Sequence, residues 1–548
     1  MRKLLLFCLI ISSLSVTAQW NSDISVNNQI CTSTGDQYSP AITSDGAGGA
    51  IIVWADNRSG NYDIYAQRIN STGSVLWQAN GVLICNASGD QFFPVIISDG
   101  AGGAIISWTD YRNDVGYTNT DIFSQKINSS GVVQWTANGI PVCNNNTNQR
   151  SVQMSLFGTG GAVFVWSDDR NGSTNSDIYA QSVDANGNFL WTANGIAVNT
   201  ASGYQLSPTI LTAGNVVTIT WLHNSGSTYS IYAQKLDASG NLQWTTNGIA
   251  VCVASGFRGT NRIITDGADG SIISWEDSRS GNADIYAQKL NASGTAQWTS
   301  NGVVVSNAYS SQSQPEIIED GNGGAILFWL DYRNATDFSV RDLYAQKINS
   351  SGTAQWTNNG LAICTATGHQ QGYKIVSDGL SGAYFTWYDL RTGTSDIYLQ
   401  RVSAGGTTLL NADGQLIGSA TNTQEFPVIV SDQANGAIVA WTDKRSGEND
   451  IYATRFLNNT TTSVRNISYE KTVALFPNPV QAGQQLYLNN AASLIGFYGI
   501  DGKKIPVTIL QSSANLQIIQ LPDVPKGIYI LETRSRNNKT EMIKVSVN

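Results

Sequence analysis

The chain has 548 residues, with 40 acidic against 31 basic side chains and a formal net charge of −9. This acidity argues against a nucleic-acid partner, because phosphate binding needs a basic patch. Two histidines and six scattered cysteines supply no His-rich or Cys-rich metal site, and no sequence feature calls for another cofactor. The length exceeds what one ordinary core can organise, so we expect several domains or a repeat array.

Residues 1–18 are predicted to be a secretory signal peptide. Arg2 and Lys3 form its positive start, residues 4–11 its apolar run, and residues 16–18 (Val-Thr-Ala) a small-x-small cleavage pattern. The apolar run is too short to cross the hydrocarbon core, which disfavours a membrane anchor. No later segment has the length of a transmembrane helix, so we expect an exported chain without a transmembrane segment.

Between residues 19 and 457 the sequence repeats a single unit. An apolar run that ends in tryptophan recurs eight times, at intervals of 54 to 58 residues. Each unit contains four short runs rich in β-branched and aromatic residues, separated by turns rich in Gly, Asn, Asp and Ser. Four strands in a repeat of this length predict β-propeller blades. The tryptophans that mark the units are Trp54, Trp108, Trp166, Trp221, Trp275, Trp329, Trp387 and Trp441.

The two ends of this repeat region complement each other. The repeat region begins at residues 20–31, which are predicted to be the end of a fourth strand. The eighth unit stops after its third strand, at residues 450–456. The N-terminal strand can therefore complete the last blade. We expect an all-β fold, with an eight-bladed β-propeller over residues 19–457 that the N-terminal strand closes; a linear β array is the alternative.

Two further sets of residues keep fixed positions in the repeat. Seven tryptophans are predicted to lie in the fourth strands, and with the eight markers they should form the core between blades, since each aromatic buries about 150–250 Å². Five cysteines end fourth strands: Cys31, Cys85, Cys143, Cys252 and Cys364. Equivalent positions in neighbouring blades should lie beyond the Cα separation of about 7 Å that a disulfide allows. We therefore predict five unpaired, half-buried thiols.

The loop after the second strand opens with Trp-x-Asp-x-Arg in seven units, and a further aspartate starts the third strand. Strand alternation puts this loop on the same face as the loops that join blades. We predict that the arginine ties both aspartates and fixes the loop. A motif present in nearly every blade indicates scaffold, because an active site needs one copy. The seven pairs are Asp56/Arg58, Asp110/Arg112, Asp168/Arg170, Asp277/Arg279, Asp331/Arg333, Asp389/Arg391 and Asp443/Arg445; the fourth unit has His223 and Ser225 instead.

Loop length distinguishes individual blades. From the motif arginine to the third-strand aspartate most loops span five positions, but the second and sixth span nine. These blades are opposite each other in an eight-membered ring. We therefore hypothesise a binding cleft across this face, because binding residues concentrate on loops of a rigid scaffold; unconstrained drift of loop length is the alternative. The residues predicted to frame the cleft are Tyr111, Tyr117, Tyr332, Phe338 and Arg341.

No catalytic constellation is evident. His223 and His369 lack a Ser or Cys partner motif. Paired-carboxylate chemistry stays open, because it needs only two acids brought together in space. We expect a non-catalytic glycan- or protein-binding adhesion module. The alternatives are a secreted glycan-active enzyme with dispersed carboxylates and a structural surface component.

The tail differs from the repeats. Residues 458–470 form a polar linker, and residues 471–548 contain short alternating strands that predict a small immunoglobulin-like β-sandwich. The segments 475–479 (Leu-Phe-Pro-Asn-Pro), 499–504, 521–522, 526–531 and 544–545 occur in an order that resembles the C-terminal sorting domain of type IX secretion substrates. The resemblance implies that the partner is the type IX machinery and that the protein is secreted through the outer membrane, to be released or attached at the surface. An ordinary terminal β domain is the alternative.

Overall fold

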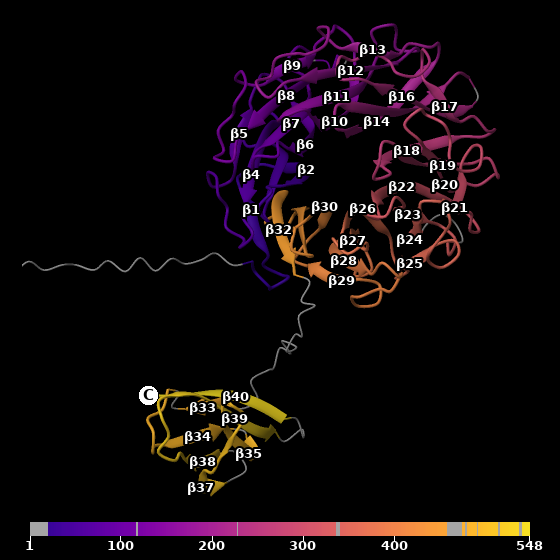
Figure 1. The fold of residues 1–548 in the computed structure, drawn as a ribbon. Coiled ribbons are helices and arrows are strands. Elements are labelled where there is room, and N and C mark those ends of the chain that lie inside the picture. The colour runs from indigo at the N-terminus through magenta and orange to yellow at the C-terminus, as the bar shows by residue number, and fades with distance from the viewer. Residues whose placement is uncertain are drawn as a thin grey trace, which may run out of the picture. The chain divides into compact units, whose positions relative to one another are not determined.

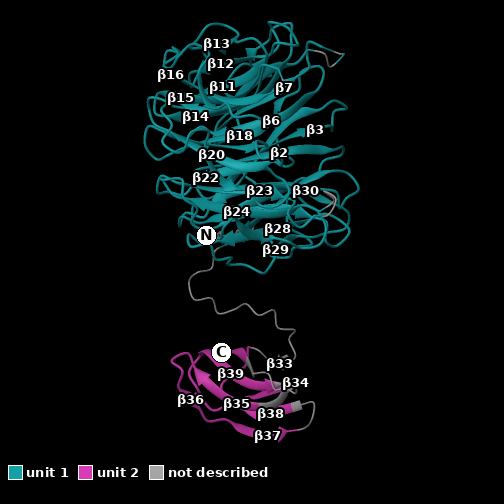
Figure 2. Cartoon of the chain, turned by 90° about the vertical axis from the view of Figure 1, so that its right-hand side faces the viewer, with its two compact units in different colours: residues 1–458 teal, residues 459–548 magenta. Residues whose placement is uncertain are grey.

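The computed structural model describes residues 20–114, 116, 119–226, 228–335, 340–457, 474–476, 479–489, 491–512, 516–535 and 540–548. The chain divides into two compact units, residues 1–458 and 459–548 (Figure 2). Within these described ranges all regular structure is β, and no helix could cross a membrane. The all-β prediction is confirmed. The predicted signal peptide (1–18) and linker (458–470) lie outside the described residues.

The first unit contains eight four-stranded antiparallel sheets in its described part. The first four are β2 to β5 (Gln37–Ser44, Ala50–Asp56, Asp63–Ile69, Val82–Cys85), β6 to β9 (Gln91–Ser98, Ala104–Asp110, Asp121–Ile127, Ile140–Cys143), β10 to β13 (Gln149–Phe157, Gly161–Asp168, Asp177–Val183, Ile196–Asn199) and β14 to β17 (Tyr204–Ala213, Val216–Asn224, Tyr229–Leu236, Ile249–Cys252). The next three are β18 to β21 (Arg258–Thr265, Ser271–Asp277, Asp284–Leu290, Val303–Ser306), β22 to β25 (Gln312–Glu319, Ala325–Asp331, Asp342–Ile348, Leu361–Cys364) and β26 to β29 (Gln370–Ser377, Ala383–Asp389, Asp396–Val402, Gln415–Gly418). The last joins β30 to β32 (Gln424–Ser431, Ala437–Asp443, Asp450–Phe456) to β1 (Asn28–Cys31).

These sheets surround a central opening in a β-propeller arrangement, with the first strand of each sheet innermost (Figure 1). Strand β1 pairs with β32, where Asn28 is opposite Ala453 and Gln29 is opposite Tyr452. The N-terminal strand therefore completes the sheet that β30 to β32 begin, as the sequence predicts. This pairing closes the ring. Every inner strand then has an inner strand of another sheet on each side (Figure 1).

The core lies between neighbouring sheets. Strand β3 is buried at every position, and the eight marker tryptophans are fully buried. One cluster combines Ile51 and Val53 of one sheet with Ile106 and Trp108 of the next. The seven tryptophans predicted in the fourth strands precede those strands instead. They also connect sheets, since the indole N–H of Trp77 donates to the carbonyl of Ser129 at 3.1 Å. Both tryptophan sets therefore hold one repeat against the next.

The second unit has two four-stranded sheets. One has the order β33-β34-β38-β37 and the other β36-β35-β39-β40. Leu486 and Ile519 of the first sheet and Phe497, Leu531 and Val545 of the second share one buried cluster. The strands are β33 (Ala474–Phe476), β34 (Gln485–Asn489), β35 (Ala491–Gly499), β36 (Lys504–Ile505), β37 (Thr508–Ser512), β38 (Leu516–Gln520), β39 (Gly527–Ser535) and β40 (Thr540–Val547).

The Trp-x-Asp-x-Arg motif builds a buried cluster at the end of each second strand that carries it. In the first sheet, Asp56 accepts the indole N–H of Trp54 at 2.7 Å. Arg58 donates to the same carboxylate from Nε at 2.8 Å and from Nη2 at 2.5 Å. The guanidinium also lies 3.9 Å above the ring of Tyr65. Across the seven motif copies the tryptophan bond is 2.7–3.0 Å long and the ring contact 3.5–4.0 Å.

The same arginine joins adjacent sheets. Arg58 Nη2 donates to the carbonyl of Asn80 at 2.8 Å and contacts the sulfur of Cys31, in the neighbouring sheet, at 3.2 Å. Asn80 Oδ1 accepts the backbone N–H of Thr32, beside Cys31, at 3.0 Å. The cysteines are therefore part of the contact between sheets.

These contacts correct two sequence expectations. The five thiols are unpaired, but they are fully buried and not half-buried, because each fourth strand ends under the next sheet's arginine. Each motif arginine also hydrogen-bonds to the first aspartate and, among the described contacts, not to the third-strand aspartate. In the first sheet its further contacts are the Asn80 carbonyl and the Cys31 sulfur. The third-strand aspartate is held by the residue that follows the arginine: the Ser59 hydroxyl donates to Asp63 at 2.6 Å. Burial raises the pKa of Cys31, Cys85 and Cys143 to about 12, which makes these thiols inert.

Arg333, in the sixth sheet, needs the same correction and differs from Arg58 in its contact with the preceding sheet. It donates to Asp331 from Nε at 2.8 Å and to the carbonyl of Asn359 from Nη2 at 2.6 Å. The predicted bond to Asp342 is replaced by one from Asn334 Nδ2 at 2.7 Å. The preceding sheet has Ser306 in place of a cysteine, and its hydroxyl also donates to the Asn359 carbonyl, at 3.2 Å. A shared carbonyl therefore joins these two sheets.

Arg445, in the last sheet, also departs from the predicted bridge between two aspartates. It donates to Asp443 from Nε at 2.8 Å and from Nη2 at 2.5 Å. Its Nη1 donates to the carbonyls of Ser25 and Val26, each at 2.8 Å, instead of to Asp450. Ser25 and Val26 precede β1, so this arginine binds the N-terminal segment that completes the ring.

Substitution of Asp110 with Asn tests how much one cluster contributes. The variant keeps the shape but leaves the Arg112 guanidinium without its buried counter-charge. Breaking such a pair costs about 3–5 kcal/mol, so we expect a clearly lower unfolding midpoint of the ring in calorimetry. Asp269→Asn, at an exposed turn, is the matched control and should leave the midpoint unchanged. An Asp110→Asn midpoint equal to wild type would show that the cluster does not stabilise the ring.

The third-strand aspartates predict a pH dependence of stability. Burial raises the pKa of Asp121 to about 6, and burial also raises the pKa of Asp63, Asp177 and Asp284. The folded state then holds a proton that the unfolded state releases at lower pH, so stability falls as pH rises from about 4 to 6. We expect Asp121→Asn to stabilise the protein by on the order of 1 kcal/mol at pH 8 and to have little effect near pH 4. Equal effects of the substitution at both pH values would contradict this.

Candidate functional site

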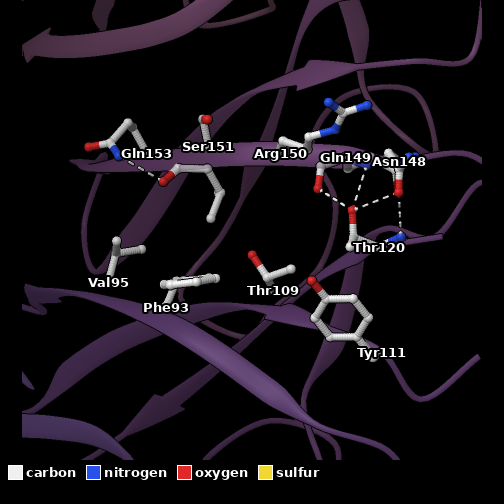
Figure 3. Close-up of a pocket in the computed structure, with 11 residues that line it drawn as sticks. Phe93, Val95, Thr109, Tyr111, Thr120, Asn148, Gln149, Arg150, Ser151 and Gln153 are labelled. Atoms are coloured by element: carbon white, nitrogen blue, oxygen red, sulfur yellow. Dashed lines mark hydrogen bonds between the residues drawn. The ribbon is translucent and has the colours of Figure 1, made fainter. Parts of the chain in front are cut away.

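The residues predicted to frame a cleft are distributed differently in the structure. Tyr111 lines a cavity of about 620 Å³ between the second and third sheets (Figure 3). Tyr332 packs against the core between its own sheet and the next one, and its backbone N–H donates to the carbonyl of Ser311 at 2.9 Å. The carbonyl of Arg341 accepts the N–H of Gln370 at 3.2 Å. Tyr117 and Phe338 lie outside the described residues.

The structure does not bring these residues together in one cavity. Among the described residues, Tyr332 and Arg341 line neither the cavity at Tyr111 nor the two central cavities described below. Both lie in the loop between β23 and β24, where their backbones bond to Ser311, just before β22, and to Gln370, the first residue of β26. The Asp/Arg pairs of the repeat, with Arg333 and Arg445 among them, also face internal partners.

The inner strands form a site that the sequence patterns did not predict. Each has a register shift against its second strand and, at the third position (the fourth in β14, which starts one residue earlier), a residue with positive φ. This φ lies between 26° and 57° in all eight strands. Such bulges re-aim side chains, and a positive φ is uncommon for residues other than glycine. The residues are Ser39, Phe93, Ser151, Ser207, Thr260, Gln314, Gly372 and Phe426.

A central cavity of about 870 Å³ lies among these strands, with walls from β2, β6, β18, β22, β26 and β30. One side of it is aromatic. Phe93 is 63% exposed and Phe426 is 49% exposed, although both are large apolar side chains. Exposed aromatic rings in a recess indicate a binding surface. We call Tyr38, Tyr62, Phe92, Phe93 and Phe426 the aromatic arc.

Ring contacts connect the aromatic arc to Tyr111. The ring centroids of Tyr38 and Tyr62 are 6.0 Å apart, and those of Tyr62 and Phe92 are 4.7 Å apart. Phe92 then lies 5.9 Å from Phe93 and 6.2 Å from Tyr111. Phe93 lines both the central cavity and the cavity at Tyr111. Among the described residues of the predicted cleft, Tyr111 is thus the one that these contacts connect to the centre.

The opposite side of the central cavity is charged. Glu316 accepts hydrogen bonds from Arg262 Nε at 3.0 Å and from Lys374 Nζ at 3.0 Å. Although burial opposes ionisation, Lys374 and Arg262 lower the pKa of Glu316 to about 2. We call Arg262, Glu316 and Lys374 the charged triad. It also lines a third cavity of about 450 Å³, next to Ser151, Gln153, Ser207, Pro208 and Thr209.

The triad occupies equivalent positions in three successive inner strands. This position is the fifth of each inner strand, or the sixth in β14, and it varies more than the positions on either side of it. It is occupied by Ala41, Val95, Gln153, Thr209, Arg262, Glu316, Lys374 and Val428. Position-by-position comparison of the repeats would have revealed this column.

Within the described part of the chain, no group of three or more His, Cys, Asp or Glu side chains is placed to hold a metal ion.

A second carboxylate lies next to the central cavity. Glu276 Oε2 accepts the backbone N–H of Gln314, a residue of the cavity wall, at 3.3 Å. Burial raises the pKa of Glu276. The residue is outside the repeat pattern, because the other sheets have no acid at this position.

Comparisons with solved structures return β-rich proteins at low identity. The chain is similar to an acylaminoacyl peptidase of Pyrococcus horikoshii (11% identity, 76% of this chain, 58% of that chain, TM-score 0.38). It is also similar to an α-L-arabinofuranosidase of Fusarium graminearum (9%, 80% and 97%, TM-score 0.35) and to an α-L-arabinanase of Penicillium chrysogenum (11%, 78% and 97%, TM-score 0.33). These similarities are too low to support an argument about the site. A comparison with curated proteins finds no match.

The comparison with protein families gives a specific result for the C-terminal tail. The family of secretion system C-terminal sorting domains matches residues 474–548. This match agrees with the order of motifs in the sequence and covers both sheets of the second unit. Residues 474–548 are therefore a C-terminal sorting domain, and the protein is exported by type IX secretion to the cell surface or the extracellular space.

Proposed function

We propose that this protein is a non-catalytic carbohydrate-binding protein of the cell surface or the extracellular space. Each four-stranded sheet of the ring is one blade of an eight-bladed β-propeller over residues 19–457. Residues 458–470 link it to an immunoglobulin-like sandwich at 471–548, which engages the type IX machinery. The seven Asp/Arg pairs are scaffold, because their charges already have internal partners.

One observation carries this proposal: the central cavity sets exposed aromatic rings opposite polar and charged side chains. A sugar ring has the same division, since its C–H faces are apolar and its hydroxyls are hydrogen-bond donors and acceptors. Phe93 and Phe426 supply flat faces, while Thr260, Gln314 and Lys374 supply polar groups. The cavity volume of about 870 Å³ is within the range of small-ligand sites and too small for a folded protein domain.

The loops of the second and sixth blades have a secondary place in this proposal. Tyr111 extends the aromatic arc through Phe92. We propose that Tyr117, Tyr332, Phe338 and Arg341 belong to the rim of the same face, where longer ligands would extend beyond the cavity.

A glycan array followed by calorimetric titration of the full chain tests the proposal. We expect Phe93→Ala and Phe426→Ala each to weaken glycan binding about tenfold, equivalent to about 1.4 kcal/mol of lost stacking. Both side chains are exposed, so the fold should tolerate the change. Tyr309→Ala is the matched control, because Tyr309 is 82% exposed and lines none of the three cavities. Unchanged affinity in both phenylalanine variants, or no glycan bound by wild type, would overturn the proposal.

A second candidate function is glycan hydrolysis, and one observation favours it. The surroundings of Glu276 raise its pKa, whereas those of Glu316 lower its pKa to about 2. Two carboxyl groups whose surroundings shift their pKa values in opposite directions are the pattern of a general acid and its ionised partner. Glu316 and Gln314, two residues before it on β22, both line the central cavity. Gln314 bonds to Glu276, so Glu276 lies next to the cavity wall.

Release of reducing ends from bound glycans distinguishes hydrolysis from binding alone. If hydrolysis occurs, we expect Glu276→Gln to abolish turnover while binding persists, because the neutral amide cannot donate the proton. Glu319→Gln, at the exposed far end of β22, is the control and should keep full turnover. Wild-type protein that binds a glycan without releasing reducing ends would exclude hydrolysis of that glycan.

A further inference from the structure

The central cavities carry a net positive charge within an acidic protein. Arg262, Glu316 and Lys374 are the charged residues among those that line the 870 Å³ cavity, and the same three line the adjoining 450 Å³ cavity. Two cations share one carboxylate, so the triad has an excess of one positive charge. The whole chain has a formal charge of −9. A cationic recess on such a background favours anionic ligands over neutral and cationic ones.

The contacts of the triad identify the group that is available to a ligand. Arg262 uses Nε and Nη2 on Glu316 and donates from Nη1 to the carbonyl of Asn261 at 3.0 Å. Lys374 donates one hydrogen bond, of 3.0 Å, to Glu316, although an ammonium group has three donors. Its side chain is 47% exposed. Glu316 and Arg262 thus position the ammonium of Lys374 at the cavity surface.

We propose that the central cavity binds an acidic oligosaccharide, with a uronate carboxylate held by Lys374 and the sugar rings against the aromatic arc. This inference rests on the proposed carbohydrate-binding function and adds the chemical class of the ligand. Lys374 supplies the charge-assisted hydrogen bond, which is stronger in a partly buried recess than on an open surface. The hydroxyls of Ser151, Ser207 and Thr209 lie in the adjoining cavity and suit the sugar hydroxyls.

Paired ligands that differ only in charge provide the test. Calorimetric titration of the full chain compares a short oligogalacturonate with its methyl ester, which keeps the same rings but has no carboxylate. We expect the free acid to bind at least tenfold more tightly at low salt, with the preference decreasing as ionic strength rises. An equal affinity for acid and ester would overturn the inference.

Variants of Lys374 assign the preference to one residue. Lys374→Met keeps most of the apolar stem and removes the charge, so its affinity for the acid should fall to that for the ester. Lys374→Arg keeps the charge and should keep most of the preference. Lys444→Met, at an exposed position of a motif loop, is the matched control and should behave as wild type. A Lys374→Met variant with an undiminished preference for the acid would also overturn the inference.

Two further arms separate this inference from the function on which it rests. Binding of neutral glycans that depends on Phe93, without any binding of oligogalacturonate, overturns the acidic class and supports the proposed function. Failure of every glycan overturns both. A poly-glutamate peptide that binds as tightly as oligogalacturonate would overturn the saccharide assignment, because the site would then recognise charge alone.

Discussion

The ring depends on one buried aspartate in each repeat that carries the motif. This carboxylate accepts hydrogen bonds from the indole of the marker tryptophan and from the guanidinium two residues later. Removing such a charge from water is costly, and the several bonds to one carboxylate offset that cost. In the first sheet the arginine in turn binds a carbonyl of its own sheet and the fourth strand of the adjacent sheet. A local motif therefore also fixes the position of each sheet against the next.

The fourth sheet shows what happens when the motif is lost. His223 and Ser225 replace the acid and the arginine, and the indole N–H of Trp221 has no partner among the described residues. Asn199 takes over the contact between sheets, with Nδ2 donating to the carbonyl of Asn247 at 2.7 Å. The His223 ring lies 5.2 Å from that of Tyr232, where other sheets place a guanidinium. One defective repeat is tolerated because the neighbouring sheets keep their own clusters.

The second and third strands of each sheet serve the structure of the ring, whereas the variable inner strands line the proposed binding site. The second and third strands repeat nearly the same residues, because every copy must fill the same space between sheets. The inner strands face a central opening that no single repeat fills, so their residues are free to differ. The bulge in each inner strand turns one residue out of the normal alternation at a cost of about 1–3 kcal/mol for a residue other than glycine. Its presence in all eight strands makes it a property of the ring, whereas the side chain it presents varies from repeat to repeat.

Short-range patterns in the chain were enough to predict the repeat, its four strands, the pairing of the N-terminal strand, the unpaired cysteines and the export route. These features depend on the alternation of apolar residues, the turn residues and the order of motifs in the tail. Which residues meet at the centre depends on the folded ring. Arg262, Glu316 and Lys374 are 54 and 58 residues apart, and they join because the ring brings successive inner strands around one axis. The exposure of Phe93 and Phe426 could not be predicted either, because a bulge interrupts the period of two on which the prediction of a strand's faces relies.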